Sequence, residues 1–143
     1  MKHFTHSLTR AFALAVLALA FQGTAQAQDQ ATPGGGVSVT PVVAENLTES
    51  PGKKLTAVVV DFAPGATSAP HQHAGFVFAY VLSGAVRSQL TGGSADVYEA
   101  GEHFIEPPGS EHLVAANASA TEPARLLAVF IADRGAELTT RSR

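Results

Sequence analysis

The chain has 143 residues, 45% of them hydrophobic, and a formal net charge of −3 at pH 7. This length suits one domain with its own core, and the acidic balance argues against nucleic acid or an anionic membrane as a partner. Because the chain has no cysteine, it forms no disulfides, and its stability must come from packing, helped by a metal or by a second subunit.

Residues 1–27 have the pattern of a secretory signal peptide. Lys2 and Arg10 supply positive charge, residues 11–21 are apolar, and Ala25-Gln26-Ala27 fits a small-x-small cleavage site. The apolar run is shorter than the roughly 20 residues that a membrane-spanning helix needs. We therefore expect cleavage near Ala27 and a periplasmic or secreted protein, in which 7 basic residues face 12 acidic ones.

The mature chain is predicted to be one all-β domain, residues 37–133, between a flexible polar leader, 28–36, and a solvated polar C-terminal tail, 134–143. Short runs rich in Val, Ile, Phe and Tyr alternate with Gly, Pro, Asn and Asp, and no segment has a convincing helical pattern. The expected strands are 37–43, 54–62, 73–82, 85–91, 95–98, 103–106, 111–116 and 124–132. Many short strands at this spacing are typical of an antiparallel sandwich or barrel.

Two histidines one residue apart, His71 and His73, precede a run of apolar and aromatic residues. In a strand, residues i and i+2 project from the same face, so the two imidazoles point the same way. Taken alone, this short motif favours a pair of surface histidines after Pro70. If the pair instead faces the interior, the rings need hydrogen-bond partners or a shared divalent cation.

The residues around this pair resemble the two motifs of the cupin superfamily, as found in small single-domain (type-2) bacterial cupins. The first motif is matched by Gly65, His71, His73 and Gly84, and the second by Gly101, Pro107, Gly109 and His112, with Asn117 one position late. The resemblance implies a double-stranded β-helix, a jelly-roll barrel, that binds one divalent metal through His71, His73 and His112. Fe²⁺ is the favoured ion, with Mn²⁺, Ni²⁺ and Zn²⁺ as alternatives.

The chain departs from the family pattern at the fourth ligand, which is a glutamate. The motif spacing puts this position at Val77, or at Phe78 with the longer spacing, and neither side chain binds a metal. Three outcomes are open: a site with three histidines, a replacement carboxylate from Glu106, or a degenerate site.

Strand alternation decides whether Glu106 is available. It puts Phe104 and Glu106 on one face of their strand, and His103 and Ile105 on the other. A glutamate at the end of a strand is more often solvated than buried. If Glu106 does face inward, His103 is a surface or interface histidine; if it faces outward, His103 becomes an alternative ligand.

The resemblance implies a metal-dependent enzyme that acts on a small molecule. We expect an oxidoreductase of the dioxygenase type, with Glu106 as ligand or general base. A metal-dependent isomerase or decarboxylase is an alternative, and so is a non-catalytic periplasmic module that binds a small molecule or a metal. Because small cupins pair through a sheet edge, we also expect a homodimer.

Overall fold

The computed structural model describes residues 35–142. The predicted signal segment, 1–27, and residues 28–34 of the predicted leader lie outside the described residues. Eleven strands form within the described range, which contains no helix. None of these residues, therefore, belongs to a helix long and apolar enough to cross a membrane.

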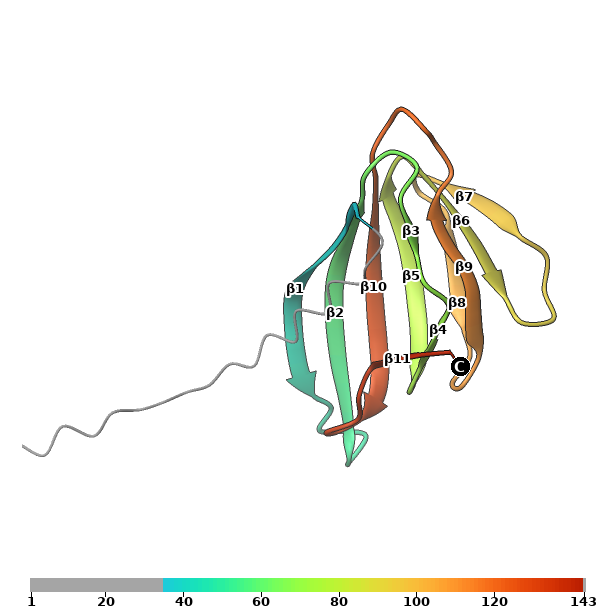
Figure 1. The fold of residues 1–143 in the computed structure, drawn as a ribbon. Coiled ribbons are helices and arrows are strands. Elements are labelled where there is room, and N and C mark those ends of the chain that lie inside the picture. Colours follow the sequence, from blue (N-terminus) through green and yellow to red (C-terminus); the bar gives the residue numbers. More distant parts are fainter. Residues whose placement is uncertain (1–34, 143) are drawn as a thin grey trace, which may run out of the picture.

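The strands form two antiparallel sheets that face each other (Figure 1). The first sheet contains, in spatial order, β1 (Val37–Asn46), β2 (Lys53–Phe62), β10 (Ala124–Asp133), β5 (Phe76–Ser83) and β8 (His103–Glu106). The second contains β11 (Thr139–Arg141), β4 (His71–His73), β9 (Glu111–Asn117), β6 (Ala85–Leu90) and β7 (Asp96–Glu99), and β3 (Thr67–Ser68) pairs with β9. This architecture confirms the predicted all-β double-stranded β-helix.

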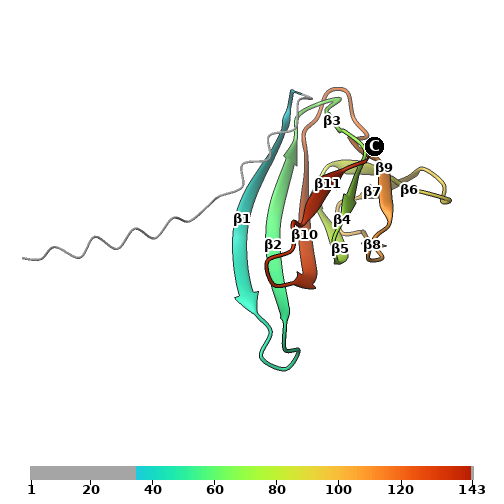
Figure 2. The same ribbon diagram turned by 60° about the horizontal axis from the view of Figure 1, so that its bottom comes forward.

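One edge of the first sheet is not covered by the second. Figures 1 and 2 show β1 and β2 extending beyond the strands of the second sheet. Accordingly, β1 is exposed at nearly every position, whereas β5 and β10 alternate between buried and accessible residues. One part of the inner face of the first sheet is therefore left uncovered.

The C-terminal segment corrects one expectation. Residues 134–143 were predicted to form a solvated tail, but Thr139–Arg141 forms β11, which pairs with His71–His73 of β4. The polar sequence showed no sign of this strand, because its side chains are at most partly buried. Its backbone hydrogen bonds nevertheless cover the edge of β4.

The predicted strand 73–82 is interrupted where the chain passes from one sheet to the other. His73 ends β4 in the second sheet, and Phe76 begins β5 in the first. Gly75 lies between them, packed so closely against β10 that an added Cβ would lie 2.8 Å from the Cα of Ala132 and closer still to the carbonyl oxygen of Ile131. The crossover therefore requires a residue without a side chain.

The core lies between the inner faces of the two sheets. Its larger cluster is centred on Phe62, Val81, Val86, Phe104 and Leu126, which are all buried. A smaller cluster consists of Val77, Ala128 and Phe130. Phe130 links this cluster to the histidines, since its ring lies 5.0 Å from that of His73 in an edge-to-face arrangement.

Asn117, the motif residue that is one position late, is a buried structural residue. Its side-chain amide donates to the carbonyl oxygens of Ala63 at 3.0 Å and Glu122 at 2.8 Å, and its Oδ1 accepts from the backbone N–H of Ser119 at 2.9 Å. Asn117 therefore fastens the end of β9 to the end of β2 and to the loop before β10.

We predict that Gly75→Ala lowers the free energy of unfolding by about 1–3 kcal/mol, because the new methyl group has to displace the backbone of β10. Urea denaturation measures the effect. Gly93→Ala is the matched control, because its Cβ would come no closer than 3.4 Å to another atom. Equal stability of the two variants would contradict the proposed close packing at the crossover.

Candidate metal centre

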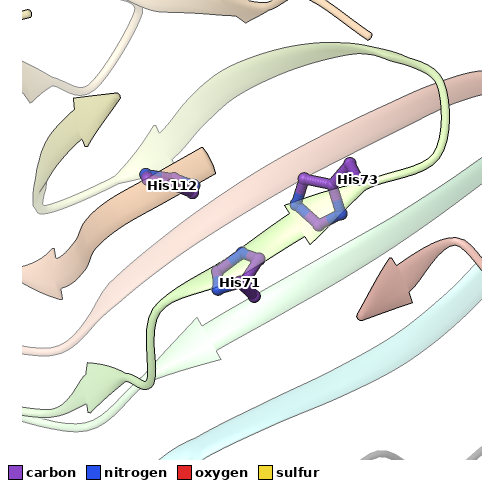
Figure 3. Close-up of side chains that lie close together, drawn as sticks. All are labelled: His71, His73 and His112. Atoms are coloured by element: carbon purple, nitrogen blue, oxygen red, sulfur yellow. The ribbon is translucent and has the colours of Figure 1, made fainter. Parts of the chain in front are cut away.

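Three histidines converge inside the barrel from two neighbouring strands of the second sheet. His71 and His73 lie on one face of β4, and His112 of β9 is the direct cross-strand partner of His71. Their candidate ligand atoms all lie within 4.8 Å of one another. Figure 3 shows the three rings gathered above the two strands. The predicted histidine set is thus brought together.

Glu106 joins this group from the opposite sheet. It is the last residue of β8 and only 3% exposed, and Phe104 on the same face of β8 is also buried. Its Oε2 lies 3.3 Å from Nδ1 of His112 and 3.7 Å from Nε2 of His73. Phe104 and Glu106 thus share the inner face, as strand alternation requires, whereas the sequence favours a solvated Glu106.

The register of the first sheet relates Glu106 to the empty motif position. Val77 on β5 is the direct antiparallel partner of Glu106 on β8. Directly opposed residues of neighbouring strands project to the same face with Cβ atoms about 5 Å apart. The family glutamate would lie at Val77 on β5. Glu106 instead presents its carboxylate to the histidines from β8, the neighbouring strand.

The turn between β8 and β9 fixes Glu106 and His112 relative to each other. Only residues 107–110 separate these strands, and Gly109 adopts a positive φ of 76°. The backbone N–H of Gly109 donates to the carbonyl oxygen of His73 at 3.2 Å. Pro107 and Pro108 restrict the backbone of the turn further. The turn therefore holds His73 in place as well as Glu106 and His112.

Each imidazole uses one ring nitrogen in a contact with the protein. Nδ1 of His71 lies 2.7 Å from the carbonyl oxygen of Ala69, and Nδ1 of His73 lies 3.0 Å from that of Leu138. Nε2 of His112 lies 2.9 Å from Oγ of Ser88. These contacts orient the rings and leave the second nitrogen of each directed toward the other members of the group, which is the arrangement that metal-binding histidines require.

The ionisation of the group also suits a cation. Burial lowers the pKa of His71 and of His73, so both imidazoles are neutral at pH 7. Burial alone would raise the pKa of Glu106, but the neighbouring imidazole of His112 outweighs it and lowers that pKa, with smaller contributions from His73 and His71 in their protonated forms. The site therefore presents an ionised carboxylate next to the neutral imidazoles of His71 and His73.

Two buried polar atoms at the centre of this group have no hydrogen-bond partner. They are Oε2 of Glu106 and Nδ1 of His112, which lie 3.3 Å apart as an ion-pair contact but not in the geometry of a hydrogen bond. A buried carboxylate oxygen without a partner is costly, and a cation among the four side chains would satisfy it. The donor set of imidazole nitrogens and one carboxylate matches the preferences of Fe²⁺, Mn²⁺, Ni²⁺ and Zn²⁺. The residues present thus fit a divalent metal.

His103 lies outside the group. It is on the exposed face of β8 and stacks on Phe78, with 5.5 Å between ring centroids. This is the surface position expected for it when Glu106 faces inward.

Sequence reasoning missed three contributors to the site: Ser88, Leu138 and Thr139. Ser88 is a buried polar residue on the inner face of β6, next to Val86 in the alternation, and this position was a readable signal. Leu138 and Thr139, whose Oγ1 lies 3.1 Å from Nδ1 of His73, come from the supposed tail and gave no such signal.

Fold and site together define a β-barrel protein with an internal histidine group suited to a metal ion. The profile of the family described as "Cupin domain" matches residues 58–130, which include all four side chains of this group. The chain belongs to the cupin family. No curated protein gave a match.

Solved structures support the fold. A DMSP lyase, DddQ from Ruegeria pomeroyi, shares 20% identity at a TM-score of 0.62 over 75% of this chain and 52% of its own. An oxalate oxidase in complex with the substrate analogue glycolate shares 26% identity at 0.58 over 77% of this chain and 56% of its own. This chain therefore spans about half the length of either protein.

A third structure is closer in size. It is an uncharacterised protein from Klebsiella pneumoniae with a double-stranded β-helix domain, 25% identical at a TM-score of 0.60. The match covers 76% of this chain and 86% of that one.

We predict that Ser88→Ala lowers the affinity for a divalent metal about ten-fold or more, because the ring of His112 loses the contact that orients it. Competition with a chromogenic chelator measures the affinity. Ser94→Ala, at an exposed serine that contacts Asp96, is the control and should bind metal like the parent protein. An unchanged affinity in Ser88→Ala would show that Ser88 does not position His112 for a metal.

Proposed function

We propose that the protein is a metal-dependent enzyme, an oxidoreductase of the dioxygenase type that acts on a small oxygen-bearing molecule. Its metal centre consists of His71, His73, His112 and Glu106, with Fe²⁺ as the favoured ion. The observation that carries the proposal is the convergence of these four side chains on one side of a cavity of about 1060 Å³, where a substrate has room beside the metal.

Each residue of the group has a defined task in this proposal. The three imidazoles donate nitrogen ligands, held in place by Ala69, Leu138 and Ser88. Glu106, whose pKa is lowered, supplies an ionised carboxylate that serves as a ligand or as a general base. A bound divalent metal would polarise a substrate oxygen and, as Fe²⁺ or Mn²⁺, would also supply a redox centre.

The likeness to oxalate oxidase supports a small oxygen-bearing substrate. That protein was solved with glycolate, a substrate analogue that carries a hydroxyl and a carboxylate on adjacent carbons. Such a molecule can chelate a metal through both oxygens. In folds of this kind, however, the reaction is set by the residues of the site and not by the fold.

We predict that Glu106→Val loses about ten-fold or more in metal affinity and that the exchange Glu106→Val/Val77→Glu restores most of it. The two positions are direct cross-strand partners with inward side chains, so the exchange preserves the composition of the site and moves the carboxylate to the neighbouring strand. Metal titration of both variants measures the effect.

Two histidine variants serve as references for this exchange. His112→Ala should lose bound metal, while His103→Ala, on the outer face, should keep it. If Glu106→Val binds the metal as tightly as the parent protein, Glu106 is not a ligand and the site consists of three histidines.

Oxygen consumption tests the reaction. We predict that the Fe²⁺-loaded protein consumes O₂ in the presence of small hydroxy or oxo acids and that His112→Ala abolishes this consumption. An oxygen electrode provides the measurement, with the metal-free protein as a blank. Tight, metal-dependent binding of these acids without any oxygen uptake would instead assign the protein to the non-catalytic binding modules.

Export and dimer formation stay predictions in this proposal. Export depends on residues 1–27, which lie outside the described range. An exposed apolar surface on the outer face of the first sheet, including Ile105 and Ile131, is compatible with a second copy.

A further inference from the structure

The cavity of the metal centre continues well beyond the four candidate ligands. Its wall includes the histidines and Glu106, but also the inner faces of β1 and β2, where Val39, Pro41, Val58 and Val60 lie. Active-site chemistry at the histidines does not require this extension. It is therefore a candidate for recognition of another part of the ligand.

The register of the first sheet gives the length of this extension. One row of direct cross-strand partners runs from Glu106 to Val77, Phe130, Thr56 and Ala44, on β8, β5, β10, β2 and β1. All five residues line the cavity. Four strand spacings of about 4.8 Å give a floor roughly 19 Å long from the carboxylate to the edge of the sheet.

Next to the far end of this floor, the inner faces of β1 and β2 are apolar although the fold leaves them uncovered. β1 and β2 extend past the second sheet (Figures 1 and 2), and Val39 is 46% exposed. Sheet faces open to water usually carry polar side chains at these positions. Apolar side chains at Val39, Pro41, Val58 and Val60 therefore indicate a surface that becomes covered when the protein functions.

Charged residues are segregated from this apolar strip. Apart from Glu106, the charged side chains of the cavity belong to Lys54, Asp133, Glu137 and Arg141, which lie at the start of β2, at the end of β10 and in the segment through β11. The strip of Val39, Pro41, Val58 and Val60 contains none. The cavity thus offers a metal-binding end, a charged rim and an apolar trough.

We propose that this cavity binds an elongated amphiphilic molecule, with a chelating oxygen-bearing head at the histidines and an acyl-type apolar body along β2 and β1. The continuity of the trough with the metal centre favours a ligand body over a second copy as its occupant. This assignment rests on the proposed function, because it takes the four side chains as the site that holds the head through a metal.

A series of alkyl hydroxamates tests the assignment, because the head group chelates metals and the chain length can be varied. Acetohydroxamate, butano-, hexano- and octanohydroxamate are titrated into the metal-loaded protein by calorimetry. The expected result is about two- to four-fold tighter binding for each added methylene, as for a methylene that is partly or fully buried. Equal affinity across the series would overturn the proposal.

Two variants locate the chain within the trough. Val39→Asp should reduce the ratio of octano- to acetohydroxamate affinity at least five-fold, because Val39 lines the trough. Val42→Asp is the matched control: this valine is also on β1 and is 59% exposed, but it lies at the bulge and does not line the cavity. The same loss in both variants would contradict the proposed path of the chain.

The series also separates this inference from the proposed function. If acetohydroxamate binds only to the metal-loaded protein while longer chains bind no better, the metal centre stands and the amphiphile is wrong. If no hydroxamate shows metal-dependent binding, the metal centre itself is wrong, and this inference falls with it. A flat series together with a dimer that Val39→Asp dissociates would assign the trough to a second copy and overturn the proposal.

Discussion

The contact between the carboxylate of Glu106 and the imidazoles of His112 and His73 joins the two sheets at the centre of the barrel. A carboxylate that is 3% exposed carries a desolvation penalty of several kcal/mol unless charges or hydrogen bonds compensate it. Neither sheet alone supplies both partners, since the histidines belong to one and the glutamate to the other. The architecture of the site is therefore set by the need to bring these buried groups together from the two sheets.

Several otherwise unrelated features of the chain serve this requirement. The short turn of residues 107–110 connects Glu106 to His112, and Gly109 ties that turn to His73. Ser88 on β6 and Leu138 before β11 hold the outer nitrogens of two rings. Rings fixed in this way lose little freedom when they bind an ion, which is how a preformed site gains affinity.

Much of this site was predictable because it depends on local spacing. The histidine positions follow from motif distances, and the shared face of Phe104 and Glu106 follows from their two-residue offset, although only the structure shows that this face is the inner one. Long-range pairing is different, because no local pattern shows that Val77 opposes Glu106 or that β11 adds to the edge of β4. The C-terminal strand was missed for this reason, because its side chains are polar and it joins the sheet through backbone hydrogen bonds.

The pairing of Val77 with Glu106 explains how the site can lack a glutamate on β5. A carboxylate on β8 keeps the charge and the inward direction of one on β5, but it leaves the β5 position free for a valine that packs with Phe130 and Ala128. The floor next to the metal centre is thereby apolar at Val77 and Phe130, on the side that leads toward β2 and β1. A glutamate on β5 would put a charged side chain on this floor, directly beside Phe130. Relocating it by one strand retains the donor set and opens the apolar path beside it.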